Sequence, residues 1–523
     1  MDVGPNRLSR LRPPVLVALA TAGVALAAGV DQLAQAHALL GIDEYDDGVY
    51  VGAALRLVNG AVPYRDFAFL HPPGIILLLS PFAALARWTG SRSFMGEARV
   101  LTVLVSSANA GLLAWLLRHR GMPAMLIAGG TLAVFPLAVA ADHTVLLEPY
   151  LVLFCLLGAM AMFASDNLAP RGRLVLAGLA FGFAGAVKIW AIFPLAVALA
   201  CCAPQFQRRI GPLLVGAVAG FALPSLAFFL LAPTDFVRDT VVLQLGRVRS
   251  TGWPPGLRLL NITGLAGLPG LDATVDLALI VAVVYALIVA CAYLAPPWSS
   301  RLDWFALGSG SVTVAAILVA PDFVPHYAYF TAAFLALLLG VSCARLLRAR
   351  SGWAAERETA AGRMLAKAER LVVVVALVAV AAVFAEGRRF IRDQPWRVNF
   401  GDAGPPISHV IPKGACVVTD EPSFTIIADR FVADSGKCPA MVDSYGEWLA
   451  ADRKHPPPSS GPYDPGLVNA WRSWFSAADY VVLTSQFRIP WTPELRSWFG
   501  DHFEAVSFEG ARVYRAKALT KQP

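Results

Sequence analysis

Charged residues are scarce in this sequence. Asp, Glu, Lys and Arg make up only 15% of its 523 residues, while hydrophobic residues make up 57%. Soluble proteins carry about 25% charged residues and need them to stay dispersed in water. The composition therefore excludes an ordinary soluble enzyme and predicts that most of the chain lies in lipid.

Signatures of nucleotide binding and of repeat-built transporters are also missing. No Gly-x-Gly-x-x-Gly follows an expected strand, and no Walker loop is present. The two halves of the chain show no matching broken helices. The net charge is +7, but the Lys and Arg residues lie in short clusters between apolar stretches. Such clusters anchor loops against anionic lipid, so the bilayer and not a nucleic acid is the expected partner.

Only seven cysteines are present. Cys416 and Cys438 stand apart in the polar C-terminal tail, where they can form a disulfide if the tail lies outside the cytosol and the geometry permits. The other five fall inside apolar stretches, where a thiol behaves as a small hydrophobic group. These five are Cys155, Cys201, Cys202, Cys291 and Cys343.

Apolar runs long enough to cross a bilayer occur repeatedly. A helix needs about 20 apolar residues to cross a hydrocarbon core of about 30 Å. The basic N-terminus imitates a secretory signal, but no cleavage site leads into a compact domain. We therefore interpret the first run as a retained span that starts in the cytoplasm. The predicted spans are 14–35, 97–117, 122–141, 149–165, 174–187, 189–205, 211–232, 273–295, 303–320, 327–344 and 371–386.

The apolar segment 72–88 decides the topology. If it crosses the membrane, every later basic loop lies outside, against the positive-inside rule. If it lies in the interface or re-enters, those loops become cytoplasmic. We therefore predict eleven spans, with the N-terminus in the cytoplasm and the C-terminus outside. Spans 174–187 and 189–205 are separated only by Lys188, and a single kinked helix there would invert this order; a lysine in that position also serves as a plain snorkelling anchor.

The character of the chain changes after residue 386. Short hydrophobic runs at 416–418 and 480–483 are interleaved with Pro, Gly and polar turns. The sequence thus predicts an all-α polytopic membrane domain over 1–386, with a first outward loop at 36–96, and an extracytoplasmic α/β domain over 387–523. Frequent Ala, Gly, Pro and Arg suggest a bacterial source, and hence the cytoplasmic (inner) membrane.

The first outward loop is rich in acid. It contains Asp43, Glu44, Asp46 and Asp47 within five residues, together with two tyrosines. Packing carboxylates together raises the pKa of at least one of them, which suits a general base or a metal site. In the alternative interpretation the loop is merely solvated, and Asp46 or Asp47 caps a helix over 49–58.

A single histidine ends the polar part of this loop. Pro72 forces His71 into an extended conformation, and Pro73 suits the first turn of a helix. His71 is therefore expected at the mouth of that helix, close to the bilayer surface. A phosphate-binding role is one interpretation, and a structural hydrogen-bonded histidine is the other.

The order of these motifs resembles a known family. Asp46-Asp47-Gly48-Val49-Tyr50 followed by His71-Pro72-Pro73-Gly74 resembles the membrane glycosyltransferases of the GT-C fold. The similarity is to the group of protein O-mannosyltransferases, lipid A aminoarabinose transferases and rhizobial lipopolysaccharide transferases. Further matches are Thr144-x-x-x-Glu148-Pro149, the stretch 177–188, His326-Tyr327, and Thr419-Asp420-Glu421-Pro422 followed by Ala428-Asp429-Arg430.

The resemblance implies roles for individual residues. Asp46, with Asp47 and Glu148, belongs to the catalytic set: Asp46 deprotonates the acceptor hydroxyl, Asp47 and Tyr50 shape the loop, and Glu148 approaches the acceptor or a metal. His71 and Lys188 contact the carrier phosphate. Relatives usually have Asp-Glu where this chain has Asp46-Asp47, so Asp43 is the alternative base.

Two further outward clusters carry polar side chains. Arg247 lies with Arg249 in a long loop, where it binds an anion near the carrier headgroup or anchors the loop among lipid headgroups. Asp322 and His326 form the second cluster, and a metal site there would need a third ligand.

The predicted function is the transfer of a sugar from a polyprenyl-phosphate carrier to a cell-envelope acceptor, with inversion. The alternative is a transporter or flippase of a lipid-linked saccharide, although transporters usually carry ionisable residues deep in the bilayer. The expected partners are the bilayer, the lipid-linked sugar and a glycan, lipid or protein acceptor. A divalent metal is a possible cofactor, and neither the donor sugar nor the acceptor is specified by any motif.

Overall fold

The computed structural model describes residues 13–35, 37–42, 44–203, 206–247, 253–267, 274–296, 299–355, 401–452, 455, 463–507 and 511–519. The predicted span 371–386, Asp43 and Arg249 lie outside these ranges.

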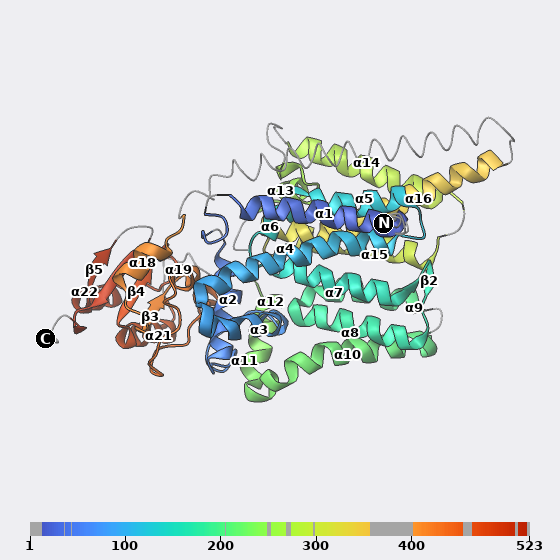
Figure 1. Cartoon of the computed structure of the whole chain (residues 1–523). Helices are drawn as coiled ribbons and strands as arrows, with labels where there is room; N and C mark the ends of the chain where they lie inside the picture. The colour runs from blue at the N-terminus through green and yellow to red at the C-terminus, as the bar shows by residue number, and fades with distance from the viewer. Residues whose placement is uncertain are drawn as a thin grey trace, which may run out of the picture.

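Long apolar helices run side by side in one bundle (Figure 1). Six helices of the described part are long and apolar enough to cross a membrane. They are α1 (Pro13–Leu33), α4 (Ser91–Leu116), α10 (Phe206–Leu231), α14 (Val275–Leu294), α15 (Arg301–Val319) and α16 (Ala328–Ala355). The chain is therefore a multi-pass membrane protein.

Shorter helices complete the bundle. α5 (Met122–Val134) and α6 (Pro136–Asp142) form a broken span bent by 57°, because Pro136 lacks an N–H and holds Phe135 extended. The others are α7 (Leu147–Met162), α8 (Arg171–Val187) and the 3₁₀ turn Ile189–Ala191 that leads into α9 (Ile192–Cys202). Every predicted span from 14–35 to 327–344 coincides with one helix or one broken pair.

The segment predicted as the first outward loop contains two helices, α2 (Tyr45–Val58) and α3 (Gly74–Thr89). Gly74 at the start of α3 packs against the end of α8, so closely that a Cβ would lie 2.6 Å from the Ala186 carbonyl oxygen. Just after α3, the Ser91 N–H donates to Asp429 in the C-terminal part at 2.8 Å. Both ends of α3 therefore lie at the same end of the bundle (Figure 1). This agrees with the predicted interfacial or re-entrant segment.

Glycines let α8 and α10 approach closely. Gly178 and Gly182 of α8 face the backbone of α10, and Gly216 and Gly220 of α10 face the backbone of α8. A Cβ at any of these positions would collide with a backbone atom of the other helix. Such small-residue spacing brings membrane helices together where lipid removes the hydrophobic driving force.

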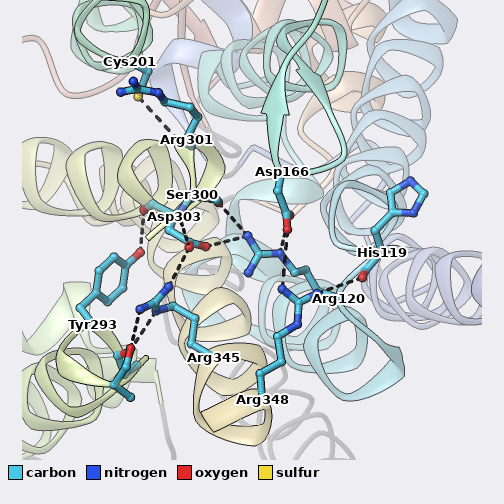
Figure 2. Close-up of polar contacts among 12 residues, drawn as sticks. His119, Arg120, Asp166, Cys201, Tyr293, Ser300, Arg301, Asp303, Arg345 and Arg348 are labelled. Atoms are coloured by element: carbon cyan, nitrogen blue, oxygen red, sulfur yellow. Dashed lines mark hydrogen bonds and ion pairs between the residues drawn. The ribbon is translucent and has the colours of Figure 1, made fainter. Parts of the chain in front are cut away.

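An ion-pair network ties the end of the bundle away from α2 (Figure 2). Asp303, in the first turn of α15, accepts from Arg120 at 2.7 Å and from Arg345 of α16 at 2.9 Å. Arg120 also pairs at 2.6 Å with Asp166, in the turn between strands β1 (Phe163–Ala164) and β2 (Asn167–Leu168). Arg120 and Arg345, which are far apart in the sequence, thus meet at one end of the bundle.

The C-terminal part is a small α/β unit. Its sheet has the strand order β3-β4-β6-β5, formed by β3 (Val417–Thr419), β4 (Tyr480–Leu483), β6 (Arg512–Ala516) and β5 (Phe503–Ser507). β3 and β4 are parallel and the other pairs are antiparallel. Both runs predicted as strands are confirmed, and Cys416 is bridged to Cys438. The helices of the unit are α18 (Gly404–Val410), α19 (Pro422–Ile427), α20 (Ser444–Ala451), α21 (Pro465–Ala477) and α22 (Pro493–His502).

This C-terminal unit packs on α2 and on the start of α4 (Figure 1). Arg92 of α4 forms an ion pair with Asp402 and donates to the Ile427 carbonyl at 2.9 Å. On α2, a Cβ added to Gly48 would lie 2.5 Å from the Ser423 nitrogen of α19. The acidic start of α2 is therefore held between the helix bundle and the C-terminal unit.

Candidate active site

The acidic motif forms the first turn of α2. The helix begins at Tyr45, with Glu44 at the N-cap position and Asp46 and Asp47 in the first turn. The interpretation in which either aspartate caps a helix starting at Val49 is therefore wrong. Negative side chains in a first turn interact favourably with the N-terminal end of the helix dipole.

Asp47 is enclosed on all sides. Its side chain has no exposed surface and pairs with Arg99 of α4, whose Nε lies 2.9 Å from the carboxylate. The other carboxylate oxygen accepts from the Val145 N–H at 3.0 Å. Both oxygens are thus occupied, and Asp47 fixes α2 against α4 and the loop before α7.

Asp46 is partly exposed, unlike Asp47. Tyr50, one turn later, donates its hydroxyl to Asp46 at 3.4 Å. The charged neighbours of Asp46 include Lys188 and Arg247 from two other segments of the bundle. Asp46 is therefore a carboxylate that a ligand can reach, set beside two cations.

Glu148 and Lys188 form a buried ion pair. Lys188 stands between α8 and the 3₁₀ turn 189–191, and its Nζ lies 2.5 Å from Glu148 in the first turn of α7. The ammonium group also lies 3.9 Å from the ring centre of Trp190 and 4.2 Å from that of Tyr327. Two ring faces and one carboxylate hold this cation in one place.

His71 reaches the same cluster from the loop before α3. Its ring packs edge-on against Tyr50, with ring centres 5.9 Å apart. Burial, followed by the nearby charges of Lys188 and Arg247, lowers the pKa of His71 well below its ordinary value of 6.5. His71 is therefore neutral at pH 7 in the unliganded protein.

Arg247 and His326 complete this side of the site. Arg247 lies 3.5 Å from Asp322, and His326 lies 4.0 Å from Glu148. Arg247 Nε and His326 Nδ1 are buried and have no hydrogen-bond partner in the described part of the chain. Buried donors of this kind usually find a partner, so both nitrogens suit a ligand.

Metal-binding residues do not gather here. Among the described residues, no three His, Cys, Asp or Glu side chains lie in a group that could hold a metal ion. The cluster predicted around Asp322 and His326 therefore gains no third ligand from these residues.

The architecture has the GT-C fold, as a comparison with solved structures shows. ArnT from Cupriavidus metallidurans, in its structure bound to undecaprenyl phosphate, superposes with a TM-score of 0.60 at 15% identity, covering 96% of this chain and 97% of ArnT. The apo structure of the same ArnT gives a TM-score of 0.59 at 14% identity, covering 95% and 97%. A scan of protein-family models and a search of curated protein sequences find no match. The likeness is thus one of fold along nearly the whole chain.

Several residues that build the site were not singled out from the sequence. Arg99 is the clearest, and an arginine within a predicted membrane span is a usable signal. Tyr45 donates to Asp443 of the C-terminal unit at 2.8 Å, and Arg488 stacks on the Tyr45 ring at 3.6 Å. These contacts join residues about 400 positions apart in the sequence, and no local pattern predicts them.

Proposed function

We propose that this protein transfers a sugar from a polyprenyl-phosphate carrier to an acceptor at the end of the bundle that carries α2. The observation that carries the proposal is the position of Asp46, a reachable carboxylate beside Lys188 and Arg247. Glycosyl transfer from a lipid phosphate needs a base for the acceptor and positive charge for the leaving phosphate. Both occur here within one cluster.

Asp46 acts as the general base. As the acceptor oxygen attacks the anomeric carbon, Asp46 takes the hydroxyl proton. The bond from that carbon to the phosphate oxygen breaks, and its electron pair leaves with the polyprenyl phosphate. Attack opposite the leaving group inverts the configuration at carbon. Asp47, with both oxygens occupied, positions Asp46 and takes no proton.

Lys188 and Arg247 receive the phosphate. Lys188 is immobilised by Glu148, Trp190 and Tyr327, so binding costs little side-chain ordering. Arg247 offers the buried Nε donor. His71 is neutral and donates a hydrogen bond, and it becomes protonated more readily once the phosphate anion arrives. Tyr50 aligns Asp46, and Glu148 positions the lysine.

An apolar groove supports the use of a lipid carrier. A hollow of about 370 Å³ lies between α8, α9 and α10, lined by residues such as Phe181, Ile189, Leu214 and Phe221. Ile189 directly follows Lys188 in the chain. Leu214 and Ile192 on its rim are exposed at 46% and 61%, so the groove opens to the lipid side. A prenyl chain in this groove would bring its phosphate to Lys188.

The charge distribution and the disulfide support the proposed orientation in the membrane. Arg120 and Arg345 lie at the end of the bundle away from α2, and the positive-inside rule places that end in the cytoplasm. Cys416 and Cys438 are bridged, which suits an oxidising compartment. The N-terminus then starts in the cytoplasm of a bacterial cell, and the active site and the C-terminal unit face outward.

The test uses purified full-length protein in lipid nanodiscs with undecaprenyl-phosphate sugars. Release of undecaprenyl phosphate is followed for wild type, Asp46→Asn and Asp43→Asn. The proposal expects Asp46→Asn to lower kcat by at least about a hundredfold with unchanged binding of undecaprenyl phosphate. Asp235→Asn, a half-exposed aspartate of the short helix α11 (Pro233–Val237), is the matched control.

Three results contradict the assignment. Full turnover in Asp46→Asn with loss in Asp43→Asn moves the base to Asp43. Full turnover in both variants removes general-base catalysis by this loop. If the wild type moves the intact carrier-linked sugar across the vesicle membrane and releases no undecaprenyl phosphate, the flippase alternative is established.

A further inference from the structure

The C-terminal unit presents a loop to the active-site side of α2. Residues 484–492 join β4 to α22, at the carboxyl end of the parallel pair β3–β4. Ligands in α/β sheets bind at the carboxyl ends of parallel strands. This end of the sheet carries Asp420 and Glu421 after β3, and Phe487 and Arg488 after β4.

Asp420 holds this loop in a fixed shape. Its side chain is fully buried and accepts from the N–H groups of Thr484 and Gln486, both at 2.8 Å. Gln486 has a backbone φ of 59°, a value that residues other than glycine rarely adopt. Strain of this kind persists only where the surroundings enforce it. The two residues that follow are therefore presented in one defined position.

Arg488 has unused hydrogen-bonding capacity. Its guanidinium lies 3.6 Å from the Tyr45 ring centre and 4.4 Å from that of Phe487. Its Nη1 forms an ion pair with Glu421 at 3.6 Å, which is too far for a hydrogen bond, and that buried nitrogen has no hydrogen-bond partner within the ranges that the structure describes. Beside it, the Phe487 side chain is 41% exposed. An open aromatic face thus adjoins a guanidinium and a carboxyl group.

Glu421 and Asp443 lie close to the catalytic aspartate. Burial raises the pKa of Glu421 to about 7 and that of Asp443 to about 6, and Asp46 is among the charges that raise both. Asp46 therefore has differently charged neighbours on its two sides. On the bundle side are the cations Lys188 and Arg247. On the side of the C-terminal unit are carboxyl groups and aromatic rings.

The direction of the reaction distinguishes these two sides. In an inverting displacement the acceptor hydroxyl must arrive opposite the departing phosphate. Because the cations fix the phosphate on the bundle side, the acceptor approaches Asp46 from the C-terminal unit. A ring with apolar C–H faces and several hydroxyl groups matches an exposed aromatic side chain flanked by a guanidinium and a carboxyl group.

Resting on the proposed function, we infer that Tyr45, Glu421, Phe487 and Arg488 form a subsite for a sugar ring of the acceptor, which makes the acceptor a glycan or glycolipid. Phe487 contacts the ring face, and Arg488 and Glu421 bind its hydroxyl groups. The Tyr45 ring packs against Arg488 and links this subsite to α2, the helix that contains Asp46.

The experiment measures two quantities on full-length protein in nanodiscs. One is the affinity for undecaprenyl phosphate, by native mass spectrometry. The other is the KM of n-octyl glycosides as acceptor probes in the presence of undecaprenyl-phosphate sugars. The expected result is a KM raised at least about tenfold in Phe487→Ala and Arg488→Ala, with carrier affinity changed less than about twofold. Phe487→Tyr, which keeps the ring, should restore a KM near that of the wild type.

Arg496→Ala is the matched control. Arg496 also lies over an aromatic ring of the C-terminal unit, 5.2 Å from the Trp491 ring centre, but it belongs to α22, far from α2 (Figure 1). The Arg496→Ala variant should have the same KM and carrier affinity as the wild type. An effect as large as that of Arg488→Ala would show a general loss of the fold and overturn the assignment.

Other outcomes separate this inference from the proposed function. An unchanged KM in Phe487→Ala and Arg488→Ala overturns the subsite alone, as does transfer by the wild type to a Ser/Thr peptide but not to any octyl glycoside. Loss of carrier affinity in Phe487→Ala would move Phe487 to the donor side. A wild type that neither binds undecaprenyl phosphate nor releases it from a donor refutes the proposed function, and the subsite with it.

Discussion

Arg99 lies against the carboxylate of Asp47, and neither side chain has any exposed surface. Arg99 also donates to the carbonyl groups of Ala38 and Leu39, at 3.0 and 2.9 Å. One guanidinium thus joins the end of the chain segment after α1 to the first turn of α2. The adjacent residue, Asp46, owes its position to this ion pair.

Substituting Asp47 should lower the stability of the protein, whereas substituting Asp46 should lower its activity. Asp47→Asn leaves the buried charge of Arg99 without its partner, and breaking a buried ion pair in this way costs about 3–5 kcal/mol. We expect a clearly lower Tm for Asp47→Asn than for Asp46→Asn, measured by fluorescence during heating. Asp46→Asn should instead lower kcat with little change in Tm. Equal Tm values for the two variants would contradict the positioning role of Asp47.

Gly48 should be intolerant of any side chain. A Cβ there would collide with Ser423 of α19, including its backbone nitrogen at 2.5 Å. Gly48→Ala should therefore loosen the C-terminal unit from α2, lower activity and speed cleavage by an added protease between the two parts. Gly23→Ala, where nothing lies within 4 Å of the added carbon, should behave like the wild type. Wild-type activity and protease resistance in Gly48→Ala would show that the interface adjusts.

The sequence predicted the bundle better than it predicted the site. Apolar runs of bilayer length depend only on local composition, and each became a helix wherever the structure describes it. The placement of 72–88 followed from loop charge, which is also local. Glu148 and Lys188 were both named as site residues, but their contact could not be predicted, because it depends on how α7 and α8 pack.

Arg488, which stacks on Tyr45 from the C-terminal unit, shows the limit more sharply. For the C-terminal part, the sequence predicts only an α/β fold. The position of Arg488 depends on Asp420, which holds the loop 484–486 after a short strand. The charge of His71 depends on the fold in the same way, because burial and then the nearby charges of Lys188 and Arg247 lower its pKa.

Lys188 should determine the affinity for the carrier. Its ammonium is held by Glu148 and two rings, and a hydrogen bond to a charged group contributes about 1.5–3 kcal/mol. Lys188→Met should therefore weaken binding of undecaprenyl phosphate by roughly ten- to a hundredfold, measured by native mass spectrometry. The matched control is Arg118→Met, which removes a cation that stacks on Trp115 at 5.0 Å in the loop after α4. Unchanged carrier affinity in Lys188→Met would place the phosphate elsewhere.

Glu447 should make the stability of the protein depend on pH. Burial raises the pKa of Glu447 to about 7, although its side chain accepts the Ala68 N–H at 2.9 Å. In the unfolded chain a glutamate titrates near its ordinary value of about 4.3. The folded protein therefore keeps this proton to higher pH than the unfolded chain. Its contribution to stability is fully present below about pH 4 and is lost as the pH rises through about 7.

The size of this effect is measurable. A pKa difference between about 4.3 and about 7 corresponds to roughly 3–4 kcal/mol at full ionisation. Thermal unfolding at pH 5 and at pH 8 should show a lower Tm at pH 8 for the wild type and a smaller difference for Glu447→Gln. The glutamine keeps an oxygen for the Ala68 N–H but does not ionise. Because Asp443 also has a raised pKa, of about 6, part of the pH dependence should remain. A Tm difference as large in Glu447→Gln as in the wild type would show that Glu447 does not ionise in this range.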